Sequence, residues 1–336
     1  MNDVDKELQL SESGLDLCEA FYREVGRPAI EKRYARYLPR MAAGLAGEGS
    51  ECYGFDDRIS MDHDYGPSFC IWVTFDDDVI FGEEIQRVID ALPAEFHGVS
   101  YRLRLEQARD RRGVETIPAF YKRFLGPKGE PQTLTEWFVL PESHLAAATN
   151  GRVFEDDLGE FSRIRNKLLG FYPDDVWLHR MACRAITMAH EGQCNYSRML
   201  RRGDTAAAFM ALSQFLTAAC SMLHLLNRRY TPYYKWAWRS AMELPRLSDA
   251  AATLRKISQC GPDLRYWPPE DWEKYAARLN LKDPAVAGIE EVCAAVGAEL
   301  MRQGLAEGGD YLEEQANELR SRIEDDLIRR QPIKVN

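Results

Sequence analysis

The stretch GEGSECYGFDDRISMDHDYGP, residues 47–67, and the apolar run FCIWVTF that follows it at residues 69–75 decide how this chain is expected to fold. The apolar run is short and nearly continuous, which is typical of a strand buried on both faces. Asp62 and Asp64 precede it, and in an extended segment residues two apart point to the same side. The sequence therefore predicts two carboxylates directed at one point beside a buried strand.

Two carboxylates this close repel each other, and a divalent cation relieves the repulsion. Magnesium prefers a few protein carboxylates together with water and substrate phosphates. Two such ions, ~3.5–4 Å apart, can hold the attacking and leaving oxygens of an in-line displacement at phosphorus. Gly49 and Ser50, with eleven residues between Ser50 and Asp62, would offer backbone N–H groups and a hydroxyl to a triphosphate, because glycine lets a ligand approach the backbone closely.

This spacing of Gly-Ser, Asp-x-Asp and apolar strand resembles the signature of the polymerase-β-like nucleotidyltransferases, which include the aminoglycoside and lincosamide nucleotidyltransferases. The resemblance implies an α+β catalytic core with a mixed sheet, two Mg²⁺ ions and three carboxylates. It also implies transfer of a nucleoside monophosphate, with AMP as the first expectation, from ATP or another nucleoside triphosphate (NTP).

A closer resemblance extends over most of the chain. Five segments are similar, in the same order, to a family of bacterial proteins with a nucleotidyltransferase-like domain, catalogued as DUF4037. The segments are residues 54–67, 113–117, 140–157, 171–178 and 228–236. This resemblance assigns a family and leaves the acceptor substrate open.

The superfamily resemblance implies a third carboxylate on another strand. Glu115, within Gly-Val-Glu-Thr-Ile at residues 113–117, follows an apparent hairpin and is the first candidate. Glu106 is the competing candidate, and either residue can instead be a surface glutamate on an edge strand. The expected catalytic and metal-binding acids are therefore Asp62, Asp64 and Glu115.

Two features depart from the superfamily pattern. His63 stands between the aspartates, where an apolar residue is usual; it can be a ligand, a partner of a ligand or, as we favour, a structural hydrogen-bonding residue. Tyr65, Gly66 and Pro67 separate the aspartates from the apolar run, and proline cannot donate to a sheet ladder. The aspartates can thus lie on a loop before the strand, which keeps a non-catalytic protein as an alternative.

A second cluster of interest is RRYTPYYKW, residues 228–236, in which Arg229 and Lys235 are candidates for phosphate contacts. Arginine matches phosphate oxygens with a bidentate fork and lysine with a point charge, while the aromatic residues could stack on a base. The competing interpretation is a helix end decorated with cations. Arg58 could likewise meet a phosphate or simply pair with the neighbouring aspartates.

Periodicity predicts helices over residues 28–46 and 81–92 and a half-buried strand over residues 99–105. After residue 132 the pattern becomes almost entirely helical. We therefore expect an α+β nucleotidyltransferase-like domain at residues 1–132 and an all-helical domain, a bundle, at residues 133–336.

Composition limits the function classes. The 336 residues carry a net charge of −10, which disfavours a nucleic-acid footprint as the main surface. The sequence contains no run of about 18 apolar residues, so we expect no membrane span. The first residues lack the basic and apolar regions of a secretory signal. The eight cysteines form no Cys-x-x-Cys pair, as expected for reduced thiols in a cytoplasmic protein. P-loop, Rossmann and nucleophile-elbow motifs are absent from the sequence.

The sequence predicts a cytoplasmic, metal-dependent nucleotidyltransferase that moves a nucleoside monophosphate to an acceptor hydroxyl, foremost on a small molecule. The alternatives are a nucleotidyltransferase acting on a protein or RNA, as in toxin–antitoxin pairs, and a non-catalytic nucleotide-binding or interaction protein. A homo-oligomer is left open.

Overall fold

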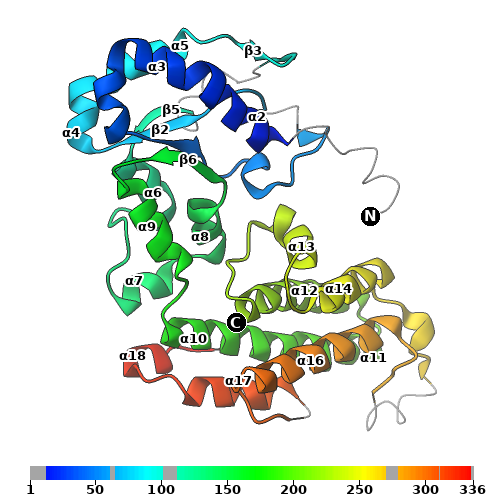
Figure 1. The fold of residues 1–336 in the computed structure, drawn as a ribbon. Coiled ribbons are helices and arrows are strands. Elements are labelled where there is room, and N and C mark those ends of the chain that lie inside the picture. The colour runs from blue at the N-terminus through cyan, green and yellow to red at the C-terminus, as the bar shows by residue number, and fades with distance from the viewer. Residues whose placement is uncertain (1–12, 61–64, 101–111, 270–278, 310, 334–336) are drawn as a thin grey trace. The chain divides into compact units, whose positions relative to one another are not determined.

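The computed structural model divides into two units by its internal contacts. It describes residues 13–60, 65–100, 112–269, 279–309 and 311–333 (Figure 1). The first unit comprises Met1–Pro131 and Ser143–Gly170, and the second comprises Gln132–Glu142 and Phe171–Asn336. The expected boundary after residue 132 lies next to the first crossing between the units, but residues 143–170, which we expected in the helical domain, belong to the first unit.

The first unit is built on a mixed sheet of four strands in the order β5-β2-β1-β6. β1 (Ala42–Leu45) runs antiparallel to both β2 (Cys70–Val73) and β6 (Arg152–Asp156), whereas β2 and β5 (Gly113–Thr116) are parallel. All four residues of β2 are buried, which confirms the strand predicted from the apolar run. The mixed sheet expected for the fold class is thus present.

The prediction of one helix over residues 28–46 is wrong at its C-terminal end. α3 (Arg27–Tyr34) is followed by a 3₁₀ helix (Ala35–Arg40) and then by β1, which lies inside the sheet. β1 needs Gly44, because a Cβ at this position would overlap the carbonyl oxygen of Arg152 in β6. β6 is likewise a strand in a stretch for which the sequence predicted helix.

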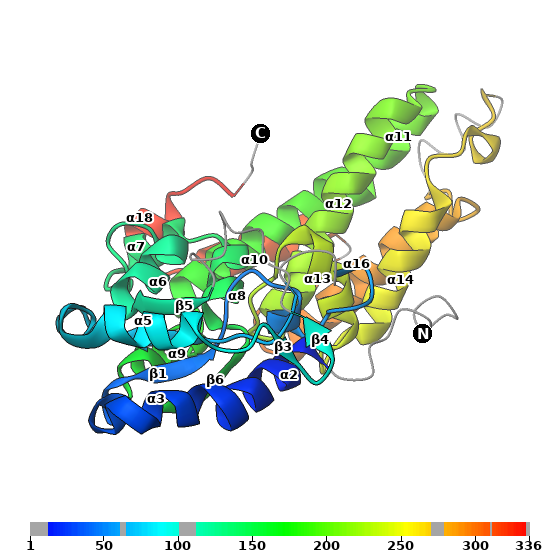
Figure 2. The same ribbon diagram turned by 90° about the horizontal axis from the view of Figure 1, so that it is seen from above.

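Two layers of helices cover this sheet (Figures 1 and 2). On one face the Trp72 ring stacks on Phe161 of α9 (Glu160–Leu169), with centroids 3.9 Å apart, and meets Phe120 of α6 (Ile117–Leu125) edge-on. On the other side Phe69, just before β2, packs against Tyr22 at 5.1 Å. A Cβ at Gly26 would overlap the Phe69 ring. The π-helix Tyr22–Gly26 can therefore lie this close to the sheet only because residue 26 is glycine. The aromatic residues around β2 therefore hold the unit together.

The remaining elements of the first unit are short. The strand predicted over residues 99–105 is described only as β4 (Val99–Ser100), which pairs with β3 (Glu95–Phe96). The other helices are α2 (Gly14–Phe21), a π-helix (Tyr22–Gly26), a 3₁₀ turn (Glu51–Tyr53), α4 (Phe75–Asp77), a π-helix (Asp78–Gly82), α5 (Glu83–Asp90), α6 (Ile117–Leu125) and α9 (Glu160–Leu169). The helix expected over residues 81–92 corresponds to α5.

The described residues of the second unit form helices and turns, without a strand. α10 packs against α12 and α17, and α14 packs against α16. The elements are α7 (Leu134–Val139), α10 (Asp174–Thr187), a π-helix (Met188–Tyr196), α11 (Ser197–Arg201), α12 (Thr205–Leu226), α13 (Tyr234–Met242), α14 (Ser248–Cys260), a 3₁₀ turn (Leu264–Tyr266), α16 (Pro284–Arg302), α17 (Leu312–Ser321) and α18 (Asp326–Arg329). α8 (Glu142–Thr149) begins where the chain returns from the second unit to the first, between Glu142 and Ser143.

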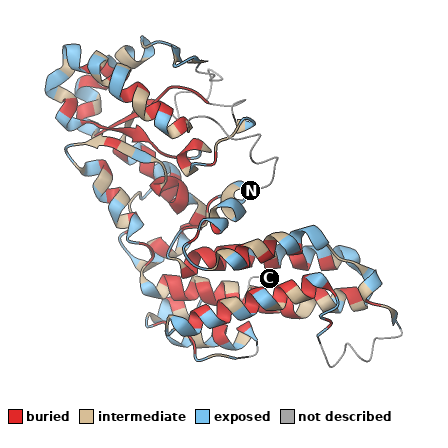
Figure 3. Cartoon of the chain, turned by 45° about the vertical axis from the view of Figure 1, so that its right-hand side comes forward, coloured by how far each residue is buried: buried red, intermediate tan, exposed pale blue. Residues whose placement is uncertain are grey.

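Helix α12 is long and apolar enough to cross a membrane by length and composition alone. However, 56% of its most apolar window is buried inside the protein, and Figure 3 shows buried residues along the packed faces of the second-unit helices. This burial is that of a core helix. The cytoplasmic location stays a prediction.

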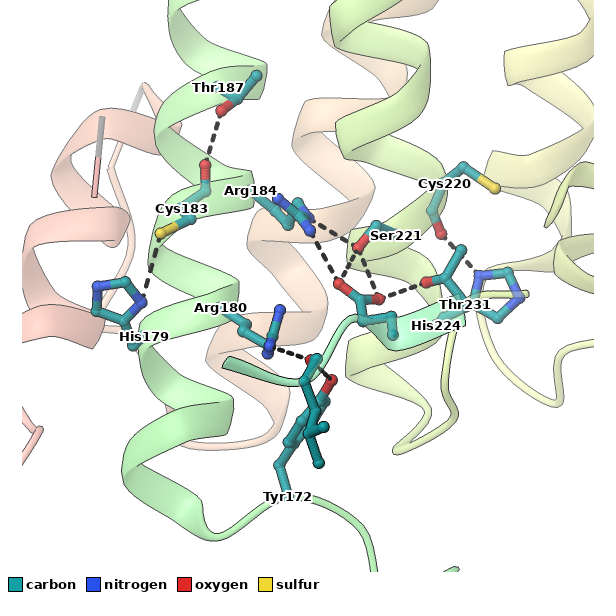
Figure 4. A network of polar contacts seen from close by, with 12 residues as sticks. Tyr172, His179, Arg180, Cys183, Arg184, Thr187, Cys220, Ser221, His224 and Thr231 are labelled. Carbon is teal, nitrogen blue, oxygen red and sulfur yellow. Dashed lines mark hydrogen bonds and ion pairs between the residues drawn. The ribbon is translucent and has the colours of Figure 1, made fainter. Parts of the chain in front are cut away.

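A buried carboxylate, Glu142, joins three parts of the second unit through Arg184, Ser221 and Thr231, the three partners that Figure 4 labels. Its side chain, 7% exposed, accepts hydrogen bonds from Ser221 on α12, Thr231 after α12 and Arg184 on α10. Burial by itself raises the pKa of Glu142, but Arg184 and the hydroxyl of Thr231 outweigh that effect, so this pKa lies below its ordinary value. The charged form is therefore the one that the fold stabilises.

We expect Gly151→Ala to lower the free energy of unfolding by about 2 kcal/mol or more. Gly151 has φ +66°, and a Cβ there would overlap the carbonyl oxygen of Leu45 at the end of β1. Gly129→Ala is the matched control, because its φ of +71° is similar while only the Lys122 side chain comes as near as 4.0 Å. Urea unfolding measures both losses, and equal losses contradict the proposed close approach.

We expect Glu142→Gln to lower the free energy of unfolding at pH 7 by about 2 kcal/mol, because three donors lose a charged acceptor. The lowered pKa of the folded carboxyl means that this contribution is complete above the ordinary pKa of 4.5 and is lost as the pH falls through the folded value. The difference in the free energy of unfolding between Glu142→Gln and the parent protein should therefore become smaller below pH 4.5. Glu243→Gln, at an exposed residue of the same unit, should show no such dependence in the same urea titrations.

Candidate functional site

The first unit contains a cavity of about 360 Å³ beside the end of β1. Its lining consists of residues 45–49, 51 and 52, of Arg112 before β5, and of Arg123 and Phe124 on α6. The loop after β1, which carries the predicted Gly-Ser pair, thus forms one wall. Arg112 and Arg123, which the sequence did not predict as site residues, line the same cavity.

The loop after β1 is held by backbone and side-chain contacts to the turn before β6. Gly47 exchanges hydrogen bonds with the Asn150 side chain, at 2.8 Å from its N–H and 2.5 Å to its carbonyl oxygen. The N–H of Gly151 donates to the Cys52 carbonyl oxygen at 2.7 Å. Gly47 has φ +125°, so the backbone turns here in a way that glycine adopts readily. The sheet therefore fixes the position of the loop.

Gly49 lines the cavity, and a Cβ there would overlap the Glu51 carboxylate, so this side chain lies directly against the glycine. Ser50 lies next to it, and its carbonyl oxygen accepts hydrogen bonds from the N–H groups of Tyr53 and Phe55. The Ser50 hydroxyl lies 3.5 Å from a Glu51 carboxylate oxygen, a long hydrogen bond. The serine side chain is thus near the cavity without a short bond to this carboxylate.

Glu51 and Arg112 form a buried ion pair at the cavity, with an N–O distance of 2.8 Å and side chains 9% and 7% exposed. The second terminal nitrogen of Arg112 lies 3.5 Å from the carbonyl oxygen of Gly66. Arg112 therefore connects the Gly-Ser loop to the segment that leads into β2. No local sequence pattern indicates this contact, because Glu51 and Arg112 are 61 residues apart.

Glu115 lies on β5 opposite Trp72 of β2, so the two side chains share a face of the sheet. Its carboxylate pairs with Arg123 of α6 at 3.2 Å, and the side chains are 23% and 32% exposed. The Arg123 guanidinium also lies over the rings of Phe120 and Phe124, 5.3 and 5.4 Å from their centroids. This second ion pair is more open to solvent than the first.

The same charged side chains act on the pKa of the buried Cys70 thiol. Burial raises the pKa of Cys70 to about 12, Arg112 and Arg123 oppose this rise, and Glu115 adds to it. Cys70 is the first residue of β2. The two arginines and Glu115 therefore act electrostatically on one position at the start of the central strand.

The structure describes only part of the predicted acid cluster. Asp62, His63 and Asp64 lie outside the described residues, and so does Glu106, the competitor of Glu115. Gly66, two residues beyond Asp64 in the chain, is the described residue whose carbonyl oxygen accepts from Arg112. β2 begins at Cys70, so Tyr65–Pro67 precede the strand and Pro67 does not interrupt its ladder.

Glu115 is the one predicted metal ligand among the described residues, and its carboxylate suits a divalent ion. Glu115 offers carboxylate oxygens, the ligand type that Mg²⁺ prefers, on a side chain that water can reach. Within the described ranges, no group of three His, Cys, Asp or Glu residues is arranged to hold a metal ion. Glu115 therefore fits as one ligand, and a complete site requires acids from residues 61–64.

The other predicted phosphate contacts, Arg58, Arg229 and Lys235, are not among the residues that line this cavity. Arg58 is exposed and is not part of the cavity lining. Arg229 and Lys235 are exposed in the second unit. In the same cluster Arg228 lies over Trp177, 3.7 Å from the ring centroid. Part of the predicted cationic cluster is thus structural.

Comparison with known proteins adds a family for the middle of the chain. Residues 137–237 match the family model described as "Domain of unknown function (DUF4037)". The predicted DUF4037 resemblance is thereby confirmed for this stretch, whereas residues 54–67 and 113–117 lie outside it. A search among curated proteins found no match.

One solved structure is similar in part, a nucleotidyltransferase-like protein from Exiguobacterium sibiricum 255-15. It shares 10% sequence identity with the chain, over 82% of this chain and 78% of that protein, with a TM-score of 0.31. A TM-score this low does not establish a common fold.

We expect Glu51→Gln and Arg112→Met each to lower the free energy of unfolding by about 3–5 kcal/mol, because each leaves a buried charge without its main partner. The double variant should lose clearly less than the sum. Glu83→Gln and Arg87→Met, at an exposed pair of the same unit, should show a coupling of only about 0.5 kcal/mol. A double-mutant cycle by urea unfolding measures both couplings, and similar values would mean that the buried pair does not organise the site.

Proposed function

We propose that this protein is a metal-dependent nucleotidyltransferase whose nucleotide site is the cavity of the first unit. The observation that carries the proposal is that the Gly-Ser loop and Arg123, the partner of Glu115, line one cavity. Arg112 supports it further, because this residue contacts both the loop and the segment just after the predicted aspartates. Asp64 is two residues from Gly66, a chain length of roughly 7 Å, which is short enough to reach the cavity.

In the proposed reaction the oxygen of an acceptor hydroxyl forms a bond to the α-phosphorus of ATP or another NTP. The bond from that phosphorus to the oxygen bridging to the β-phosphate breaks, pyrophosphate leaves with the electron pair, and the hydroxyl proton passes to water. Two Mg²⁺ ions, when bound by Asp62, Asp64 and Glu115, would supply charge stabilisation for both oxygens. The role of Gly49 and Ser50 is to receive the triphosphate with backbone N–H groups.

The proposed partners are a nucleoside triphosphate and a small-molecule acceptor. Arg58, Arg229 and Lys235 stay proposed phosphate contacts on the strength of the sequence alone; all three are exposed cations, Arg58 in the first unit and the other two in the second. The net charge of −10 argues against RNA as the acceptor.

A non-catalytic nucleotide-binding protein is the second candidate. The observation that favours it is the start of β2 at Cys70, six residues after Asp64, because the aspartates then precede the strand. A strand holds two carboxylates in a more fixed geometry than a loop does. Binding without transfer would support this candidate.

We expect Asp62→Asn to weaken Mg²⁺-dependent binding of ATP at least about tenfold while the thermal unfolding midpoint stays unchanged. The reason is that the carboxamide keeps the shape but not the charge that attracts the ion. Glu84→Gln, at an exposed residue of α5, is the control and should bind as the parent protein does. Isothermal titration calorimetry with and without EDTA measures the effect.

Transfer itself is tested by incubating the protein with labelled NTPs, Mg²⁺ and a metabolite extract, followed by mass spectrometry. We expect an adduct whose mass increases by one nucleoside monophosphate and whose formation requires Asp62. Nucleotide binding without any adduct would leave only the non-catalytic candidate. The absence of nucleotide binding would overturn both.

A further inference from the structure

The charges around the cavity are arranged in pairs of opposite sign. Glu51 is neutralised by Arg112, and Arg123 is held by Glu115. A polyphosphate entering this cavity therefore meets cations that are already engaged with carboxylates. For an anion to bind well, one arginine has to change partner.

The two arginines differ in their freedom to do this. Arg112 is 7% exposed, and its departure would leave Glu51 buried without its cation, which is costly. Arg123 is 32% exposed and meets Glu115 at 3.2 Å, longer than the 2.8 Å of the buried pair. Exchanging its carboxylate for another anion is therefore less costly for Arg123 than for Arg112.

The surroundings of Arg123 support such a movement. Its guanidinium lies over the rings of Phe120 and Phe124, and Phe124 lines the cavity beside it. Cation–π attraction extends to about 6 Å from a ring centroid, so a small movement away from Glu115 can keep the guanidinium within its range. A guanidinium also matches phosphate oxygens with two parallel hydrogen bonds.

We propose that Arg123 exchanges partners, binding Glu115 when no cation is present and binding the phosphates of the nucleotide when a divalent cation occupies Glu115. This inference rests on the proposed function, and it assigns a specific role to a residue outside the predicted set. Cation and nucleotide then strengthen each other's binding, because the cation releases the arginine that the nucleotide uses. By linkage this coupling is the same in both directions.

The test uses the full chain, Mn²⁺ as the cation probe and an ATP analogue with a methylene bridge between the α- and β-phosphates. Free Mn²⁺ is followed by electron paramagnetic resonance, and analogue binding by calorimetry with EDTA or with Mn²⁺. The parent protein should bind the analogue at least about tenfold more tightly with Mn²⁺ than with EDTA. These readouts require no turnover.

In Arg123→Gln two opposite changes are expected. Mn²⁺ alone should bind as tightly as to the parent protein or more tightly, because Glu115 has lost its competing cation. The analogue in the presence of Mn²⁺ should bind about tenfold or more weakly, because a charge-assisted contact is gone. Arg123→Lys keeps the charge without the fork and should lie between the two.

Arg87→Gln is the matched control, since Arg87 is an exposed arginine of the same unit that pairs with Glu83. It should change neither affinity. If Arg123→Gln and Arg123→Lys bind the analogue as the parent protein does, or if Arg123→Gln binds Mn²⁺ alone more weakly, the exchange of partners is overturned while nucleotide binding stands. If the parent protein binds no analogue under either condition, the proposed function fails and takes this inference with it.

Discussion

The ion pair between Glu51 and Arg112 is the contact that brings the parts of the candidate site together. Its members are 61 residues apart and almost completely buried. Glu51 belongs to the loop after β1, Arg112 to the segment before β5, and the Gly66 carbonyl oxygen that Arg112 also contacts to the segment before β2. One guanidinium thus joins the segment after β1 to the segment before β2 at the end of the sheet where β5 begins.

The two ion pairs at the cavity, Glu51–Arg112 and Glu115–Arg123, differ in burial, and this difference suits one to positioning and the other to binding. Removing charges from water is costly, so a pair such as Glu51–Arg112 persists by excellent geometry and contributes specificity more than stability. The Glu115–Arg123 pair is half-exposed, and its attraction is screened by water. A buried pair such as Glu51–Arg112 suits residues that have to keep one position. A half-exposed pair such as Glu115–Arg123 suits a group that must engage a ligand.

Local patterns in the sequence were enough to predict the central strand and a strand carrying Glu115. The run at residues 69–75 is long and apolar enough to stand out, and β2 is found within it. β1 was missed because Ala42–Leu45 contains small residues without alternation, directly after a helical stripe. Arg112 was missed because its importance arises from a contact across 61 residues, which leaves no periodic signal. Asp62 and Asp64 stay predictions, since they lie outside the described residues.

The family match and the packing of the second unit lead to the same segment. Residues 137–237 contain Glu142 and all three of its hydrogen-bond donors, so one buried carboxylate links the beginning of the matched stretch to its end. One donor, Thr231, lies within the cationic segment 228–236, where Arg228 is also held over Trp177. Arg229 and Lys235 therefore extend from a backbone fixed at several points, although both side chains are exposed. An anion that binds them would therefore order the two flexible side chains but not the backbone that carries them, which lowers the conformational entropy lost on binding.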